Sequence, residues 1–146
     1  MGWKEKLSGW ASTFDCRVRS PLSGEQVADK LSRLGNVPGF VYEFYRACNG
    51  LESDWFVILP LEDASDMRRT WNSIGRANDV DKTRFLGGDP ELLERFLVFA
   101  SLSGLTCAVV DRQTGSIWFE EDGDLHETDM ALEEFIEVTL KEVRDL

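Results

Sequence analysis

The residues best suited to chemistry lie in one acidic segment, FEEDGDLHETD, at positions 119–129. Grouped carboxylates can accept paired hydrogen bonds from arginine and can attract lysine, so the segment is a candidate surface for a basic partner. The candidate partner-binding residues are Trp118, Glu120, Glu121, Asp122, Asp124, Glu127 and Asp129. The alternative is a polar turn between a strand and a helix, in which Thr128 or Asp129 caps the helix.

The same segment contains part of a calcium-loop pattern. Asp122 and Asp124 flank a glycine and supply carboxylates, but a calcium loop that began at Asp122 would also need glycine at its sixth position. Glu127 occupies that position, although Glu133 stands at the twelfth. We therefore expect no calcium site, and we expect no other metal or cofactor.

The residue pattern gives little support for a catalytic function. The chain has one histidine, so a triad or a histidine-dependent base would have to use His126. The GxSxG, GxGxxG, P-loop and HExxH patterns are absent. Paired carboxylates are too frequent in this acidic chain to be diagnostic. We expect no catalytic residues and a protein that is not an enzyme; a hydrolase that uses the acidic segment is the less favoured alternative.

The negative charge is concentrated near the C-terminus. The net charge is −11, and residues 111–146 contain 12 acidic and 3 basic side chains. Nucleic-acid binding requires a basic face, so this distribution argues against direct contact with nucleic acid. It permits a basic protein partner, which the field would steer toward the surface. The alternative is a solvated acidic surface that keeps the protein soluble.

The cysteines and the apolar runs predict a cytoplasmic protein. Cys16, Cys48 and Cys107 are far apart, odd in number and without CxxC spacing, which argues against disulfides and zinc. Cys48 and Cys107 lie in apolar runs and are predicted to be buried thiols. No apolar run approaches the roughly 20 residues of a membrane helix, and the N-terminal segment lacks the apolar stretch of a secretory signal.

The order of the expected elements predicts an α+β fold. Apolar spacing predicts helices at residues 24–35, 38–48, 63–78 and 131–143, and residues 3–14 form a short helix or pack irregularly. Strands are expected at residues 55–61, 96–101, 106–111 and 116–121, with a turn and a short edge strand within residues 122–129. This order predicts a single domain over residues 1–146, with a mainly antiparallel sheet, a C-terminal meander and flanking helices. Residues 1–20 are a candidate N-terminal extension.

Local signals mark several boundaries of these elements. Ser23 and Gln26 have the spacing of a capping box, and Pro38 suits the first position of a helix. The Asn49–Gly50 pair is predicted to end that helix with a left-handed residue and to begin a turn. Gly115 suits a tight hairpin with positive φ between the last two long strands.

The chain has five tryptophans, many for its length. Trp55 and Trp118 are expected in strands, Trp71 in a helix, and Trp3 and Trp10 near the start of the chain. Most are predicted to be core or half-buried residues. An exposed indole beside the acidic segment would resemble an interface hot spot.

The order of four segments resembles the SUKH superfamily, which includes the yeast cell-wall-synthesis regulator and many bacterial proteins. The segments are VPGFVYEFYRACNGLE, FVILPLED, FLVFAS…TCAVVDRQTGSIWFEEDG and ALEEFIEVTLKEV. They correspond to a proline-led helix that ends in Asn-Gly, a strand that closes on Leu-Pro, a meander with an Asp–turn–Gly hairpin, and a final helix that contains phenylalanine. The resemblance spans residues 24–143, although residues 67–90 within it match nothing in the pattern.

The resemblance implies function by binding. Many bacterial members of the superfamily look like immunity proteins that neutralise a cognate toxin, and the toxins are often nucleases. The resemblance therefore implies a SUKH-like immunity protein whose partner is a cognate toxin or another basic protein domain. An adaptor of the same fold, without a toxin partner, remains the alternative. Neither the residues nor the resemblance defines an oligomeric state.

Overall fold

The computed structural model describes residues 2–61, 73–102 and 106–144 and shows a single α+β domain, which confirms the predicted fold class. Within these residues the helices are α1 (Trp3–Phe14), α2 (Gly24–Ser32), α3 (Gly39–Ala47), α4 (Ile74–Ala77), a 3₁₀ turn η1 (Phe85–Gly88), α5 (Pro90–Arg95) and α6 (Leu132–Arg144). The strands are β1 (Arg17–Val18), β2 (Leu51–Glu52), β3 (Val57–Ile58), β4 (Phe96–Ser101), β5 (Cys107–Asp111), β6 (Ile117–Glu121) and β7 (Asp124–Glu127). Most of the helix predicted at residues 63–78, with Met67 and Trp71, lies outside the described residues.

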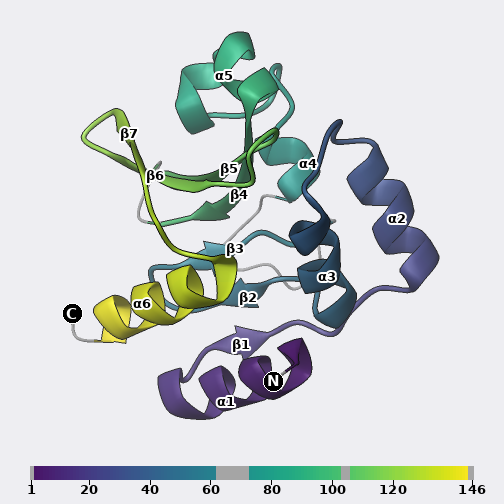
Figure 1. Cartoon of the computed structure of the whole chain (residues 1–146), viewed down its shortest axis with the longest axis vertical. Coiled ribbons are helices and arrows are strands. Elements are labelled where there is room, and N and C mark those ends of the chain that lie inside the picture. The colour runs from purple at the N-terminus through teal and green to yellow at the C-terminus, as the bar shows by residue number, and fades with distance from the viewer. Residues whose placement is uncertain (1, 62–72, 103–105, 145–146) are drawn as a thin grey trace.

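The seven described strands form one antiparallel sheet in the order β1-β2-β3-β4-β5-β6-β7. Each strand pairs with the next strand in the chain, so the meander extends through the whole sheet and not only its C-terminal part. The register of β4 against β5 shifts between Val98 and Ala100, a bulge that increases the local twist. The edges of this sheet are β1 and β7 (Figure 1).

The first residues of the chain contribute to the same core. Leu7 and Trp10 of α1 are buried. Trp3 packs edge-on against Trp10 and against Phe44 of α3, with ring centroids 6.3 Å and 5.2 Å apart. Asp15 follows α1 in the left-handed region and turns the chain toward β1. The tryptophan-rich start of the chain is therefore a packed helix.

Two of the local signals in the sequence, the capping box and the hairpin glycine, act as predicted. Ser23 caps α2, and its side chain and that of Gln26 form the reciprocal bonds of a capping box. Gly115 has a φ of 79° in the turn between β5 and β6. The sequence predicts Pro38 at the first position of a helix. α3 begins at Gly39, so Pro38 instead occupies the position just before the helix.

Gly50 is needed because two backbone segments approach each other closely. A Cβ atom at this position would lie 2.5 Å from the carbonyl oxygen of Ile58, and the φ of Gly50 is +97°. The side-chain oxygen of Asn49 accepts a hydrogen bond from the Leu61 amide at 2.8 Å. The helix stop predicted at this pair is wrong, because α3 ends at Ala47 and Cys48 follows it in an extended conformation. The Asn49–Gly50 pair instead joins the segment after α3 to the segment after β3.

The prediction of one strand at residues 55–61 is wrong in its extent and in its placement of Trp55. Only Val57–Ile58 form β3, and the indole of Trp55 lies in the turn before it, where the residue is 55% exposed. Ser53 closes this turn through bonds between its hydroxyl and the backbone of Phe56. β3 pairs with β2 at only two positions, Leu51 with Ile58 and Glu52 with Val57, so the apolar run reflects burial of its side chains and not a long ladder.

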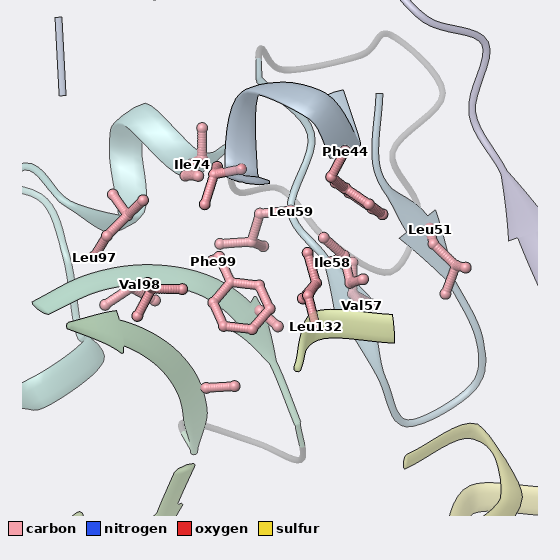
Figure 2. Close-up of a cluster of buried hydrophobic side chains, with 14 of the residues drawn as sticks. Phe44, Leu51, Val57, Ile58, Leu59, Ile74, Leu97, Val98, Phe99 and Leu132 are labelled. Atoms are coloured by element: carbon pink, nitrogen blue, oxygen red, sulfur yellow. The ribbon is translucent and has the colours of Figure 1, made fainter. Parts of the chain in front are cut away.

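The C-terminal elements lie where the sequence predicts them. The predicted strands correspond to β4, β5, β6 and the edge strand β7, and the last predicted helix corresponds to α6. One apolar stripe of α6 is buried, formed by Leu132, Phe135, Ile136 and Leu140. The ring of Phe135 packs edge-on against Phe56 and Phe99. Figure 2 shows the side chains of Leu132, Phe99 and Ile58 meeting in the core.

Candidate functional site

The acidic segment folds into the β6–β7 hairpin at the end of the sheet. Figure 1 shows this hairpin on the side of the molecule opposite α2. Glu121 pairs with Asp124, so Asp122 and Gly123 form the connecting turn. Both turn residues have positive φ, 54° and 87°, as a type I′ turn requires. This turn matches the twist of paired strands, so the hairpin holds its acidic residues in a fixed geometry.

The strand alternation divides the predicted site between two faces of the sheet. Trp118 and Glu120 lie on one face, together with Glu127 of β7. Glu121 and Asp124 lie on the opposite face. Asp122 is at the tip, and Asp129 lies in the connection to α6. The structure therefore brings these residues onto one hairpin but does not place them on one flat surface.

Trp118 is half-buried and packs against the sheet. Its ring lies 5.3 Å from that of Phe96, at an angle of 64°. The guanidinium of Arg95 lies over both rings, 4.6 Å from the Phe96 centroid and 5.3 Å from that of Trp118. The indole nitrogen is buried, and it has no hydrogen-bond partner among the described residues. The polar end of Trp118 thus points inward, so the hairpin presents carboxylates rather than this indole donor.

Asp111 fixes the turn that leads into β6. Its Oδ1 accepts hydrogen bonds from the backbone amides of Gln113 and Thr114, and its Oδ2 lies 3.4 Å from Nε of Arg95. Burial alone would raise the pKa of the Asp111 carboxyl. The hydrogen bonds from Thr114, Gln113 and Arg95 outweigh burial, and they leave that pKa below the ordinary value for aspartate. The start of the hairpin is therefore anchored by a carboxylate that prefers its charged form.

Glu120 differs from its exposed neighbours because it is partly buried. Burial raises the pKa of its carboxyl above the ordinary value for glutamate. The thiol of Cys107 is buried, and burial, with a contribution from the charge of Glu120, raises the pKa of that thiol to about 12. The packing of Glu120 in the sheet thus disfavours the charged form of its carboxyl group.

The histidine lies on the hairpin surface. His126 is exposed, and its ring tilts by 30° over Phe119, with centroids 5.4 Å apart. The main hollows formed by described residues are lined by other parts of the chain, and none of them includes His126 or the hairpin carboxylates. Within the described residues, no group of three or more His, Cys, Asp and Glu side chains is placed to hold a metal ion.

The largest of these hollows is a groove of about 580 Å³ between α1 and α6. Its apolar surface comes from Trp10 and Phe14, and carboxylates from both helices line it. The indole nitrogen of Trp10 donates to Oε1 of Glu137 at 3.4 Å, which joins the two helices. No sequence signal could have located this groove, because it depends on the pairing of the first and last helices.

Thr128 extends the hairpin and does not cap the last helix. Its amide and its hydroxyl both donate to the carbonyl of Ile117, each at 2.9 Å. α6 begins at Leu132, directly after Ala131. The capping roles considered for Thr128 and Asp129 are therefore wrong, because Ala131 directly precedes the helix and the ladder between β6 and β7 continues to Thr128.

The division of the acidic residues between two faces could have been found from the sequence. Asp122–Gly123 is a typical type I′ pair between two alternating segments, and such a turn fixes the register of the strands beside it. The exposure of Trp55 could also have been predicted from the sequence, since Ser53 and Asp54 are turn-forming residues just before it.

Comparisons of the chain with protein-family models, with characterised proteins and with solved structures found no match. Among the described residues, no helix combines the length and the apolar character that crossing a membrane requires.

Proposed function

We propose that this chain is a non-enzymatic binding protein of the immunity type, which neutralises a cognate toxin by covering a basic surface with the β6–β7 hairpin. The observation that carries the proposal is the hairpin itself, an ordered element at the end of the sheet with carboxylates on both faces and at its tip. The resemblance to the SUKH superfamily supports the immunity role. A nuclease-type toxin suits the charge, because its phosphate-binding surface must be basic.

The charge and rigidity of the hairpin favour this use. Nine acidic residues and no lysine or arginine lie between Gln113 and Leu140. Such a field accelerates the approach of a basic domain. The type I′ turn also reduces the conformational entropy that would be lost on binding. These features suit a protein that imitates the phosphates of a nuclease substrate.

The thiols support a location in the cytoplasm. Cys16, Cys48 and Cys107 are all described, and all are buried and free. Disulfides accumulate in oxidising compartments, so three unpaired cysteines suit a reducing one.

An adaptor that binds a peptide is the second candidate, and the groove between α1 and α6 favours it. The groove has a peptide-sized volume of about 580 Å³ and an apolar surface at Trp10 and Phe14. A hydrolase has less support, because His126 is exposed and lies outside the main hollows that the described residues form.

The test is capture of the partner from the host, followed by association kinetics with the identified protein. We expect the association rate to fall at least about tenfold between about 0.05 M and 0.5 M salt, as screening removes the steering. Substituting Glu120→Lys, Glu121→Lys and Asp122→Lys together should slow association by a similar factor at low salt. The partner should also be basic, and its toxic activity should be lost in the complex.

The control changes the net charge by the same amount at another place. Glu25, Glu43 and Glu94 are exposed and lie on α2, α3 and α5, so their replacement by lysine alters the total charge equally. If both triple variants slow association equally, net charge and not the hairpin determines the rate. If the hairpin variant binds like the unchanged protein, the interface lies elsewhere and the proposal fails.

A further inference from the structure

The last strand of the sheet offers an open backbone edge. A type I′ turn is flanked by a hydrogen-bonded pair, here Glu121 and Asp124, and the bond from the Thr128 amide to Ile117 confirms this alternation. The backbone groups of Leu125 and Glu127 must therefore point away from β6. No hydrogen bond to these outward N–H and C=O groups is present within the described part of the chain. β7 thus presents two donors and two acceptors in the spacing that another strand requires.

The distribution of carboxylates also favours approach along this edge. Glu127 and Glu120 lie on one face of the hairpin, and Asp124 and Glu121 lie on the other. A partner that lay flat on either face would reach only one of these pairs. A strand placed beside β7 would project its side chains alternately to both faces, so it would neighbour the β7 member of each pair, Glu127 on one face and Asp124 on the other.

We propose that β7 receives an extended basic segment of the partner as an additional antiparallel strand. This inference rests on the proposed function and adds the mode of recognition. Backbone bonds to Leu125 and Glu127 supply the pairing, while lysine or arginine side chains on both faces of the incoming strand meet the carboxylates.

The same charges disfavour a second copy of this chain as the occupant. Antiparallel pairing of β7 with another β7 would bring Asp124 and Glu127 of one copy close to the acidic residues of the other. Like charges on neighbouring strands destabilise the pairing. The edge therefore resists self-association while it remains open to a strand of opposite charge.

The first test uses a synthetic peptide of about ten residues, a usual upper length for a strand, with a repeat of two lysines and two threonines, which places lysine on both faces of the strand. Its control is the same peptide with an N-methyl group on every backbone nitrogen, which keeps the charge but removes the donors on both edges of the strand. We expect the unmodified peptide to slow amide exchange at Leu125 and Glu127 in the full chain, and to bind at least about tenfold more tightly than its control. Equal binding of the two peptides, unchanged exchange at both amides, or no binding at about 1 mM peptide would overturn the inference.

A pair of variants tests the same bonds from the side of the protein. Leu125→Pro removes an outward N–H group, which an edge strand tolerates, whereas Leu125→Ala keeps that group and removes most of the side chain. Affinity for the unmodified peptide should fall about 3- to 10-fold further in Leu125→Pro than in Leu125→Ala. Equal affinity in the two variants would contradict strand pairing.

The two proposals fail in different ways. If both peptides bind equally well and charge reversal at Glu120, Glu121 and Asp122 weakens both, the acidic hairpin binds basic partners without strand pairing. Only the further inference is then lost. If charge reversal changes neither the binding of the peptides nor association with the captured partner, the proposed function is lost as well.

Discussion

Replacing Gly50 by alanine should test whether the close approach of two backbone segments shapes this fold. The added Cβ would lie 2.5 Å from the carbonyl oxygen of Ile58 and 3.2 Å from the nitrogen of Pro60. Both of these atoms belong to the backbone, so they cannot rotate away as the end of a flexible side chain could. The end of β3 would have to move away from the Asn49–Gly50 segment.

The magnitude has two parts that a second glycine separates. An alanine at positive φ costs about 1–2 kcal/mol, and this applies to Gly50 at +97° and to Gly123 at +87°. A Cβ atom added at Gly123 would meet nothing within 4 Å, so Gly123→Ala should cost only that amount. Overpacking at Gly50 adds about 1–3 kcal/mol, so Gly50→Ala should lower the free energy of unfolding by about 2–5 kcal/mol in total.

The assay is urea unfolding of the unchanged protein and both alanine variants, followed by circular dichroism. The difference between the two variants, about 1–3 kcal/mol, isolates the contact with Ile58, provided that the slope against urea is unchanged. Equal loss of stability in Gly50→Ala and Gly123→Ala would refute the reasoning, because the close approach would then contribute nothing beyond the unfavourable φ.

Three further measurements follow from buried groups. Burial raises the pKa of the Cys48 and Cys107 thiols to about 12, so a thiol reagent at about pH 8 should modify them only after the protein unfolds. The lowered pKa of Asp111 gives stability that is present above the ordinary aspartate pKa and is lost as the pH falls below about 4; Asp111→Asn should therefore reduce the difference between urea midpoints at about pH 7 and pH 3. The hydroxyl of Tyr45 donates to the carbonyl of Leu59 at 2.7 Å in the core, so Tyr45→Phe should cost about 1–3 kcal/mol on unfolding, and no loss would show that the bond is replaced.

Elements with a complete local signal could be predicted from the sequence. The capping box at Ser23 and Gln26 depends only on neighbours in the chain, and it forms as expected. The strands β4 and β5 are apolar runs, β6 begins with one, and Gly115 marks the turn between β5 and β6; the structure confirms all three strands and this turn. The amphipathic spacing of α6 also predicts which side of the helix is buried.

Elements whose form depends on distant parts of the chain could not be predicted. The strand β2 is only two residues long, and it exists because Leu51 pairs with Val18 on one side and with Ile58 on the other. Glu52 reads as a polar turn residue, yet it is buried and forms an ion pair with Arg19 at 3.0 Å. The apolar run after Trp55 resembles a strand, although its burial depends on packing from several elements rather than on a long ladder.

The cross-strand pair of Glu121 and Asp124 is the feature of the hairpin that the fold itself does not explain. The two residues lie directly opposite each other beside the turn, where like charges destabilise pairing by about 0.2–1 kcal/mol. A lysine in place of Asp124 would protect the edge strand from self-association and would also attract Glu121, so edge protection does not require this pair. A partner with basic side chains on both faces of β7 would relieve the repulsion on binding. The repulsion between Glu121 and Asp124 in the free hairpin would then contribute to its preference for a basic strand.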